Sequence, residues 1–427
     1  MRHFISRRAL IQATILGALA NFRGTNSGSA AAPIAIKSVQ TSKSSIQLNV
    51  ISTADLRVFI EYGFQKSKYL KKTSVVNVAK GQLKSLVITD LTADTAVFIR
   101  VRYSLIGRST FLALPAVESK TSSSTANSTF AIQADPHMDE NSSADVYNGT
   151  LNQIVAAAPA FLMDLGDIFM VDKLADKSEA NIRARFVLMK DFYKKLGSIP
   201  LKICLGNHDG ELGYSKFNTK SYRKEYFPEE TYDLAYYSFT GPDQLHVVLD
   251  PFTYTTKNPT SAGWEWTLGK TQYDWLVETL TSSNATHKFV YIHHLLVGDA
   301  QSRGGVEIAK YNEWGGLNKD GSAGFAANRP GWAKPIHQLL LDTKVGFVFK
   351  GHDHLYVKQE LDGIIYQTVP QPSHAGDKVN SATEYGYLQG KIVGGSGFMR
   401  VSTGASTVQV DFVKWDGSIA DTYTCGG

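Results

Sequence analysis

The sequence predicts an α/β protein in which a small β domain precedes a larger domain of alternating strands and helices. In residues 36–116, short runs with period-two alternation, such as Ile46, Leu48 and Val50, are separated by polar turns. This pattern is typical of a β-sandwich. From Thr129 onward, apolar runs alternate with stretches of helical apolar spacing. A chain of 427 residues has room for both domains, since about 100 to 200 residues per domain is typical.

Residues 1–32 are predicted to be a twin-arginine type export signal. Arg7 and Arg8 precede a mildly apolar stretch, 9–20, which is too short and too polar to span a bilayer. Alanine-rich segments at 18–20 and 30–32 are the two candidate cleavage sites. The alternative is a basic tail with a chance arginine pair. We expect a periplasmic or secreted protein without a stable membrane span.

Charge and cysteine content say little about binding partners. The formal net charge is +5, and we expect much of the excess in the N-terminal segment. Without long basic runs or interleaved basic and aromatic residues, nucleic-acid binding is not expected. Cys204 is expected to be a small buried hydrophobe, and a bridge to Cys425 is permitted but not required. The sequence does not indicate an oligomeric state.

Five apolar runs of the second domain each end in residues that can bind a metal. Open α/β sheets place their ligands at the edge where strands end, and carboxylates with imidazoles suit transition metals. The runs 129–133, 160–163, 201–204, 288–292 and 345–349 are followed, in order, by Asp135-Pro136-His137, Gly166-Asp167, Gly206-Asn207-His208-Asp209, His293-His294 and Gly351-His352-Asp353-His354.

In this order the five motifs resemble those of the calcineurin-like metallophosphoesterase superfamily, over residues 129–415. The resemblance implies a four-layer α/β/β/α sandwich. The segment 91–95 is similar to a turn of fibronectin-type-III-like domains, such as the N-terminal domain of purple acid phosphatases. Residues 117–128 are then the expected linker and 416–427 a C-terminal tail. Helices are expected at 144–157, 178–196, 268–280 and 332–341, and closing strands at 364–369, 397–402 and 407–413.

The resemblance also implies two divalent transition-metal ions, of manganese, zinc or iron. Asp167 is the expected bridging ligand, because a carboxylate offers lone pairs to both cations. The further ligands of the first metal are expected to be Asp135, His137 and His354. Those of the second metal are expected to be Asn207, His293 and His352. His294 is either a substrate contact or a structural neighbour of His293.

The expected reaction is hydrolysis of a small phosphate monoester or diester by metal-bound hydroxide. His208 is expected to protonate the leaving alkoxide, and Asp209 either orients its ring or binds the loop backbone. The alternative is a secreted binding or adhesion protein with an inactive phosphoesterase domain. Six further residues lack motif support for a metal role, and only the last could reach the site: Asp164, Asp172, His246, Asp250, His337 and His374.

Two regions and one position leave further alternatives. The β domain either shapes the substrate entrance or is a passive spacer, and residues 211–237 form either a lid or a surface loop.

Purple acid phosphatases carry a tyrosinate ligand three residues after the second-motif aspartate, where this chain has Met170. They also lack a histidine at the position of His137. We therefore expect a colourless protein that uses divalent metals.

Overall fold

The computed structural model describes residues 32–121, 127–209, 222–227, 235–255, 263–296, 303–377 and 379–426. The chain divides into two units after Pro33, and every named strand and helix belongs to the second, Ile34–Gly427. All but one residue of the expected export signal lie outside the described residues. No helix within these described ranges is sufficiently long and apolar to cross a membrane.

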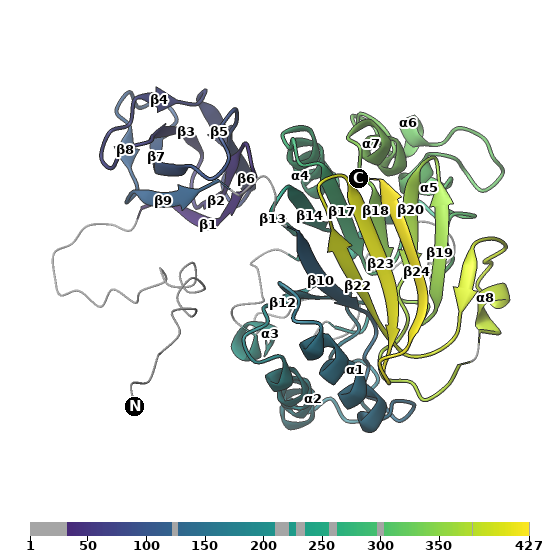
Figure 1. Ribbon diagram of the computed structural model, residues 1–427. Helices are drawn as coiled ribbons and strands as arrows, with labels where there is room; N and C mark the ends of the chain where they lie inside the picture. The colour runs from purple at the N-terminus through teal and green to yellow at the C-terminus, as the bar shows by residue number, and fades with distance from the viewer. Residues whose placement is uncertain are drawn as a thin grey trace, which may run out of the picture. The chain divides into compact units, whose positions relative to one another are not determined.

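The N-terminal part of the second unit is a β-sandwich of two sheets, as predicted (Figure 1). One sheet has the order β1-β2-β6, and the other has β4-β3-β7-β8, with β5 on β3 and β9 on β7. Alternate side chains of both sheets, such as Leu48 and Ile60, are buried in a shared core. The strands are β1 Ile34–Thr41, β2 Ile46–Ser52, β3 Leu56–Gly63, β4 Lys71–Lys72, β5 Val76–Val78, β6 Leu83–Ile88, β7 Ala96–Leu105, β8 Leu112–Ala113 and β9 Val117–Lys120.

The first sheet of the larger domain has the order β12-β11-β10-β22-β23-β24. Its first three strands are parallel to one another, and the last three are antiparallel. The range 416–427, expected as a tail, contains β24, which pairs with β23 along its length. The strands are β10 Ser128–Gln133, β11 Leu162–Asp164, β12 Leu201–Ile203, β22 Gly397–Thr403, β23 Thr407–Lys414 and β24 Ile419–Gly426.

The second sheet has the order β13-β14-β17-β18-β20-β19-β21, with β14, β17, β18 and β20 parallel. Its apolar side chains, including Phe289 and Phe347, join Phe130 and Met163 of the first sheet in one core. The strands are β13 Tyr237–Gly241, β14 Gln244–Val248, β17 His287–Ile292, β18 Phe347–Lys350, β19 Tyr356–Leu361, β20 Ile364–Thr368 and β21 Lys391–Val393, and β15 Thr253–Tyr254 pairs separately with β16 Trp266–Thr267.

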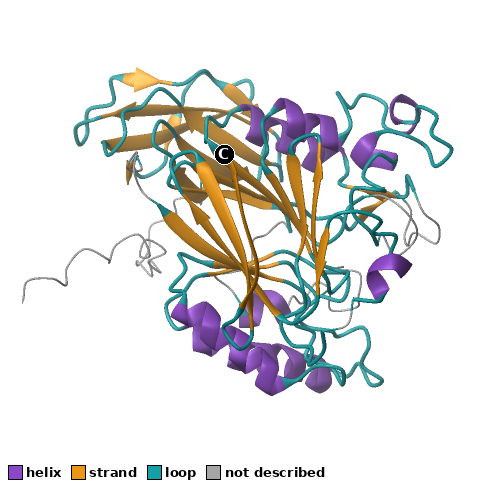
Figure 2. Ribbon diagram, turned by 45° about the vertical axis from the view of Figure 1, so that its right-hand side comes forward, coloured by secondary structure: helices purple, strands orange, loops and turns teal. Residues whose placement is uncertain are grey.

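Helices cover the outer faces of the two sheets, which confirms the four-layer α/β/β/α sandwich (Figure 2). Helices α1 Ala144–Ala156, α2 Glu179–Tyr193 and α3 Tyr222–Tyr226 pack on the first sheet, and a 3-10 turn, η1 Lys194–Leu196, follows α2. Ser143 caps α1 by accepting a hydrogen bond from the amide of Val146. The remaining helices are α4 Lys270–Thr281, α5 Asn312–Gly315, α6 Phe325–Asn328, α7 Ile336–Asp342 and α8 Ser381–Glu384.

The segment expected as a lid or loop, 211–237, is described only at 222–227 and 235–237. Within it, Tyr222 of α3 is buried and its ring lies 6.0 Å from that of Phe186 on α2. This part of the segment therefore belongs to the helical layer over the first sheet. The rest of the expected lid lies outside the described residues.

Candidate metal centre

Five strand ends bring the predicted metal ligands together. Asp135 follows β10, Asp167 follows β11, and Asn207 follows β12 in the parallel part of the first sheet. His293 follows β17, and the loop with His352 follows β18 in the second sheet. Parallel strands end at the same edge of their sheet, so side chains far apart in the sequence converge there. These convergent loops build the candidate metal centre.

The first group of donors contains Asp135, His137 and His354, whose ligand atoms all lie within 4.8 Å of one another. Oδ1 of Asp135 lies 3.8 Å from Nε2 of His137 and 3.6 Å from Nε2 of His354. Among the described residues, Asp135 Oδ1 and His137 Nε2 are buried without a hydrogen-bond partner. Buried polar atoms are rarely left unpaired. A cation among these atoms would satisfy them, so a divalent metal fits this group.

The second group contains Asp167, His293 and His352. Nε2 of His293 lies 3.4 Å from Oδ2 of Asp167 and 3.2 Å from Nδ1 of His352. The amide oxygen of Asn207 lies 3.1 Å from the same Nε2. A carboxylate, two imidazoles and an amide oxygen form a donor set that suits a divalent transition metal.

Asp167 links the two groups. Its Oδ2 is 3.4 Å from Nε2 of His293 in the second group and 3.7 Å from Nε2 of His137 in the first. Its other oxygen, Oδ1, accepts a hydrogen bond of 2.8 Å from the amide of His208. One carboxylate oxygen thus faces donors of both groups, which is the arrangement that a bridging ligand requires.

Backbone hydrogen bonds orient two of the donors, Asp135 and His293, so that one atom of each side chain faces the site. The amide of His352 donates to Oδ2 of Asp135 at 2.8 Å, so Oδ1 faces the site. Nδ1 of His293 lies 2.8 Å from the carbonyl oxygen of Leu165, which fixes the ring with Nε2 toward Asp167. Partners of this kind commonly set the tautomer and orientation of metal-binding histidines.

The backbone of the centre is strained at its donors. Asp135, His137, Asp167, His352 and His354 all have φ between 52° and 71°. Residues with a side chain rarely occupy this left-handed region, and each such conformation costs about 1 to 3 kcal/mol. Strain at five donors indicates a site whose backbone is shaped for binding rather than for local stability.

Two glycines allow the second and third motif loops to touch. A Cβ atom on Gly166, which has φ of 100°, would lie 2.2 Å from the amide nitrogen of Gly206. A Cβ atom on Gly206 would lie 2.1 Å from the amide nitrogen of Asp167. Any larger residue at either position would push Asp167 away from the third motif loop.

The electrostatics of the centre favour the metal-binding forms of Asp135, Asp167 and His354, but they favour the protonated forms of His137 and His293. Burial disfavours the charge of Asp135 and Asp167, but the neighbouring imidazoles outweigh burial and lower the pKa of both carboxyl groups. Burial lowers the pKa of His354 to about 4. Burial also disfavours charge on His137, yet the nearby carboxylates of Asp135, at 3.8 Å, and Asp139, at 3.7 Å, raise its pKa to about 10. A metal must therefore displace a proton from His137.

His208 faces the centre, and its orienting carboxylate is not the predicted one. Nδ1 of His208 lies 2.7 Å from Oδ2 of Asp172, and its Nε2 lies 3.8 Å from Oδ2 of Asp167. Asp172 therefore fixes the ring with Nε2 toward the site. Of the two alternatives for Asp209, orientation of this ring is therefore wrong, and no role was predicted for Asp172. Its position five residues after Asp167, in the same loop, was the available signal.

Asp209 binds the backbone of two motif loops instead. Its Oδ2 accepts hydrogen bonds from the amides of Gly206 and Asp167, both at 2.7 Å. Its Oδ1 accepts from the amides of Ile168 and Phe169 at 2.5 and 3.0 Å. Because it binds four backbone amides, the buried carboxylate holds the second and third motifs together. Of the two roles considered for Asp209, this is binding to the loop backbone.

The unassigned histidines fall into two groups. His294 is packed against Trp266 and Phe252, and its Nδ1 lies 2.9 Å from the carbonyl oxygen of Leu295, as expected of a structural neighbour. His246 and His337 have partners away from the centre. His374 alone of this set shares a pocket with a metal donor, His354.

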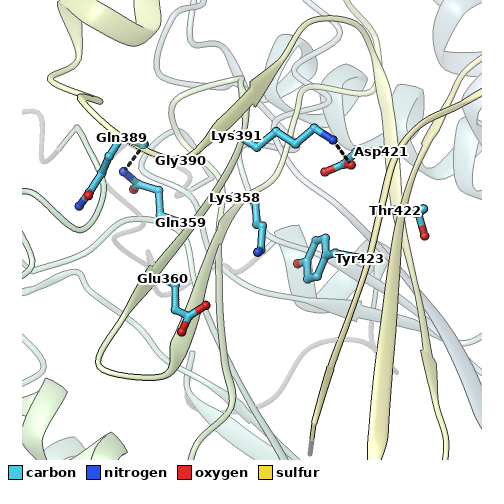
Figure 3. Close-up of a pocket in the computed structure, with 9 residues that line it drawn as sticks. All are labelled: Lys358, Gln359, Glu360, Gln389, Gly390, Lys391, Asp421, Thr422 and Tyr423. Atoms are coloured by element: carbon cyan, nitrogen blue, oxygen red, sulfur yellow. Dashed lines mark hydrogen bonds and ion pairs between the residues drawn. The ribbon is translucent and has the colours of Figure 1, made fainter.

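Two pockets of the described part of this domain bear on where a substrate binds. The one of about 200 Å³ is lined by His354, Gln371, His374 and Tyr385, and it opens beside the first donor group. A larger pocket, of about 450 Å³, lies between β19 and β21 of the second sheet and β24 of the first, and contains no metal donor (Figure 3). There Lys391 is paired with Asp421. The smaller pocket is therefore the candidate place for a substrate.

The fold and the site define a four-layer protein with two adjacent groups of metal donors at the converging ends of its strands. A family model described as calcineurin-like phosphoesterase matches residues 128–356. This match covers more than half of the chain, and the chain belongs to the calcineurin-like phosphoesterase family. No curated protein matches it.

Several solved structures are similar to this chain at low sequence identity. The structure of PhoD has a TM-score of 0.51 and 13% identity, over 94% of this chain and 92% of that chain. The purple acid phosphatase PPD1 from yellow lupin (Lupinus luteus) seeds has a TM-score of 0.47 and 14% identity, over 91% and 73%. GAP50, the anchor in the inner membrane complex of Plasmodium, has a TM-score of 0.46 and 12% identity, over 70% and 89%.

Proposed function

We propose that this protein is an exported phosphoesterase that hydrolyses small phosphate monoesters or diesters with two divalent metal ions, manganese, zinc or iron. The observation that carries the proposal is the position of Asp167. Its Oδ2 lies within 3.7 Å of imidazole nitrogens from both donor groups. Family membership supports the same class of reaction.

The residues around the metals have distinct tasks. When bound, two metal ions supply charge stabilisation for in-line phosphoryl transfer and lower the pKa of a water molecule. His208 presents Nε2 toward Asp167 while Asp172 holds its Nδ1. Protonated His208 then donates a proton from Nε2 to the oxygen of the leaving group, as general acids do. The smaller pocket beside His354 receives the organic part of the ester.

The test of the proposal is hydrolysis of nitrophenyl phosphate and bis-nitrophenyl phosphate by purified protein whose metal content is measured. With manganese added we expect turnover of at least one of these esters, and a chelator should abolish it. His337→Gln is the matched control, because His337 binds Tyr366 and Asp362 away from the centre. Protein that holds two metals and turns over neither ester would favour the alternative, an inactive binding or adhesion protein.

The export part of the proposal rests on the arginine pair in the N-terminal segment. Arg7 and Arg8 directly precede an apolar stretch, Ala9–Ala20, that contains no charged residue. Exchange of both arginines for lysine should retain the protein in the cytoplasm, as measured by cell fractionation. Equal export of this variant and the unchanged protein would exclude the twin-arginine route.

A further inference from the structure

The positive charge of this protein is concentrated in the β-sandwich. Residues 34–120 contain 13 lysines and arginines but only five acidic residues, whereas residues 121–427 contain 27 basic and 34 acidic residues. The N-terminal segment, which we expected to hold much of the excess, contributes four arginines and no acidic residue. The sandwich is thus a basic module attached to an acidic phosphoesterase domain.

Much of this charge lies in one hairpin, residues 64–72, which we call the lysine hairpin. It connects β3 to β4 and carries Lys66, Lys68, Lys71 and Lys72. No acidic residue occurs between Glu61 and Asp90. The four lysines are exposed, and none forms an ion pair with any residue that the structure describes. Their charges are therefore available to an anionic partner.

The hairpin has a defined conformation. The amide of Lys68 donates to the carbonyl oxygen of Gln65 at 3.0 Å and closes the turn, and Ser67 lies within it at φ of 63°. Gly63 allows the chain to fold back, because a Cβ atom there would lie 1.8 Å from the carbonyl oxygen of Lys68. The backbone thus presents the lysines on a fixed loop.

The same loop exposes large apolar side chains among the lysines. Leu70 is 87% exposed and Phe64 is 45% exposed. Nζ of Lys71 lies 5.3 Å from the centre of the Phe64 ring, and Arg100 lies over the ring of Tyr69 at 4.4 Å. Exposing a leucine to this extent has no value for folding, because the hydrophobic effect favours its burial. The expectation that basic and aromatic residues are not interleaved is therefore wrong for this hairpin.

We propose that the lysine hairpin binds the surface of a membrane that contains anionic phospholipids. The ammonium groups contact lipid phosphates, and Leu70 and Phe64 enter the boundary between headgroups and acyl chains. Surface-bound segments combine these two contributions, apolar insertion and attraction to anionic lipid. A soluble polyanion would use the lysines but would leave Leu70 in water, so the exposed leucine favours a lipid surface.

Cosedimentation of the full chain with lipid vesicles tests this proposal. We expect binding to phosphatidylcholine vesicles that contain phosphatidylglycerol and much weaker binding to vesicles of phosphatidylcholine alone. Raising the salt to about 1 M should weaken binding, because the screening length falls from about 10 Å at 0.1 M to about 3 Å. Protein that binds heparin but not these vesicles would overturn the proposal in favour of a soluble polyanion.

Two variants assign the binding to the hairpin. Exchange of Lys66 and Lys68 for glutamine should weaken vesicle binding about 25-fold, because each lysine near an anionic surface contributes about fivefold, or about 1 kcal/mol. Leu70→Ser should weaken it about tenfold, since burial of a leucine is worth at least that factor. If either variant bound vesicles as tightly as the unchanged protein does, the proposal would be overturned. Binding of the lipid by the N-terminal segment instead of the hairpin would give this result.

Matched controls separate this site from general charge and hydrophobicity. Lys195 and Lys319 are exposed lysines of the phosphoesterase domain, and their exchange for glutamine removes the same charge. Ile106 is 58% exposed and directly follows β7. It lies at the opposite end of the sheet from the hairpin, because Leu105 pairs with Leu56 at the start of β3, whereas the hairpin follows Gly63 at its end. Ile106→Ser and the lysine control pair should both bind vesicles as the unchanged protein does. If the control variants weakened vesicle binding as much as the hairpin variants do, the assignment of binding to the hairpin would be overturned.

Discussion

The carboxylate of Asp172 lies 2.7 Å from Nδ1 of His208, and this contact turns the opposite ring nitrogen toward Asp167. The neighbouring carboxylate of Asp209 makes no such contact and instead accepts four backbone hydrogen bonds. One aspartate therefore acts on the ring of the proposed acid, and the other acts on the loops that carry the metal donors.

Asp172→Asn tests the first role. The amide no longer stabilises the protonated ring, so proton donation to a poor leaving group should weaken. We expect about 10- to 100-fold slower hydrolysis of alkyl phosphates, a smaller loss with nitrophenyl esters, and unchanged metal content. As a contrast, Asp209→Asn should lower the free energy of unfolding by about 1 to 3 kcal/mol, since buried amides lose their acceptor. If Asp172→Asn slowed both ester classes equally, the contact with His208 would be structural.

Replacement of His208 tests the acid itself. Loss of a general acid costs about 100- to 10,000-fold, and the cost depends on how much the leaving group needs a proton. His208→Ala should therefore slow alkyl esters strongly and nitrophenyl esters, which leave unaided, much less. Rates for a series of leaving groups of graded pKa measure this dependence. Parallel losses along the series would identify His208 as a group that positions the substrate.

Asp167→Asn should lower metal content and activity together. Oδ2 of Asp167 faces imidazoles of both donor groups, and a neutral amide bridges two cations poorly. We expect loss of at least one metal per chain, measured by elemental analysis of dialysed protein beside the rate of nitrophenyl phosphate hydrolysis. A variant that loses activity but keeps both metals at full occupancy would contradict the bridging role.

The sequence predicted the parts of this protein that depend on chain order and periodicity. Apolar runs followed by polar motifs identified β10, β11, β12, β17 and β18, because the fold brings the carboxyl ends of parallel strands to one edge. The order of the motifs then indicated which side chains meet there. The period-two alternation of apolar residues in β2 and β3 likewise predicted the sandwich.

The errors concern features that periodicity does not encode. Asp209 and Asp172 are both acidic residues close to motif positions, and only the path of the loops decides which reaches the ring of His208. The range 416–427 was predicted to be a tail, because β24 is an edge strand that buries only Asp421 among its side chains. The lysine hairpin was overlooked because its significance lies in exposure, which a sequence does not give.

A buried carboxyl group outside the metal centre predicts a pH dependence of stability. Burial raises the pKa of Asp164 to about 7 although Gln133 and Tyr193 donate hydrogen bonds to its Oδ2 at 2.6 and 2.5 Å. The folded protein therefore holds this proton more tightly than the unfolded chain does. The resulting stability is complete below pH about 4 and is lost as the pH rises through about 7.

Asp164→Asn should remove this part of the pH dependence. Urea unfolding of chelator-treated protein at pH about 4.5 and about 7.5 measures it, and the loss of unfolding free energy between the two should be smaller in the variant by about 2 to 4 kcal/mol. Residues of the metal centre titrate in both proteins and cancel in the comparison. An equal loss in both proteins would show that Asp164 is ionised in the folded state throughout.

Iron-loaded protein should be colourless. Purple enzymes owe their colour to charge transfer from a tyrosinate ligand to ferric iron, and the corresponding residue here is the buried Met170. The first donor group contains His137 instead, with its Nε2 3.8 Å from Asp135 and 3.7 Å from Asp167. A neutral imidazole stabilises ferric iron less than a phenolate does, so divalent metals are favoured. Visible absorption of iron-loaded protein, compared with a His137→Tyr variant as a positive control, measures the difference. A strong tyrosinate-to-iron band in the unchanged protein, lost on replacement of a single tyrosine, would show that a phenolate binds where we assign His137.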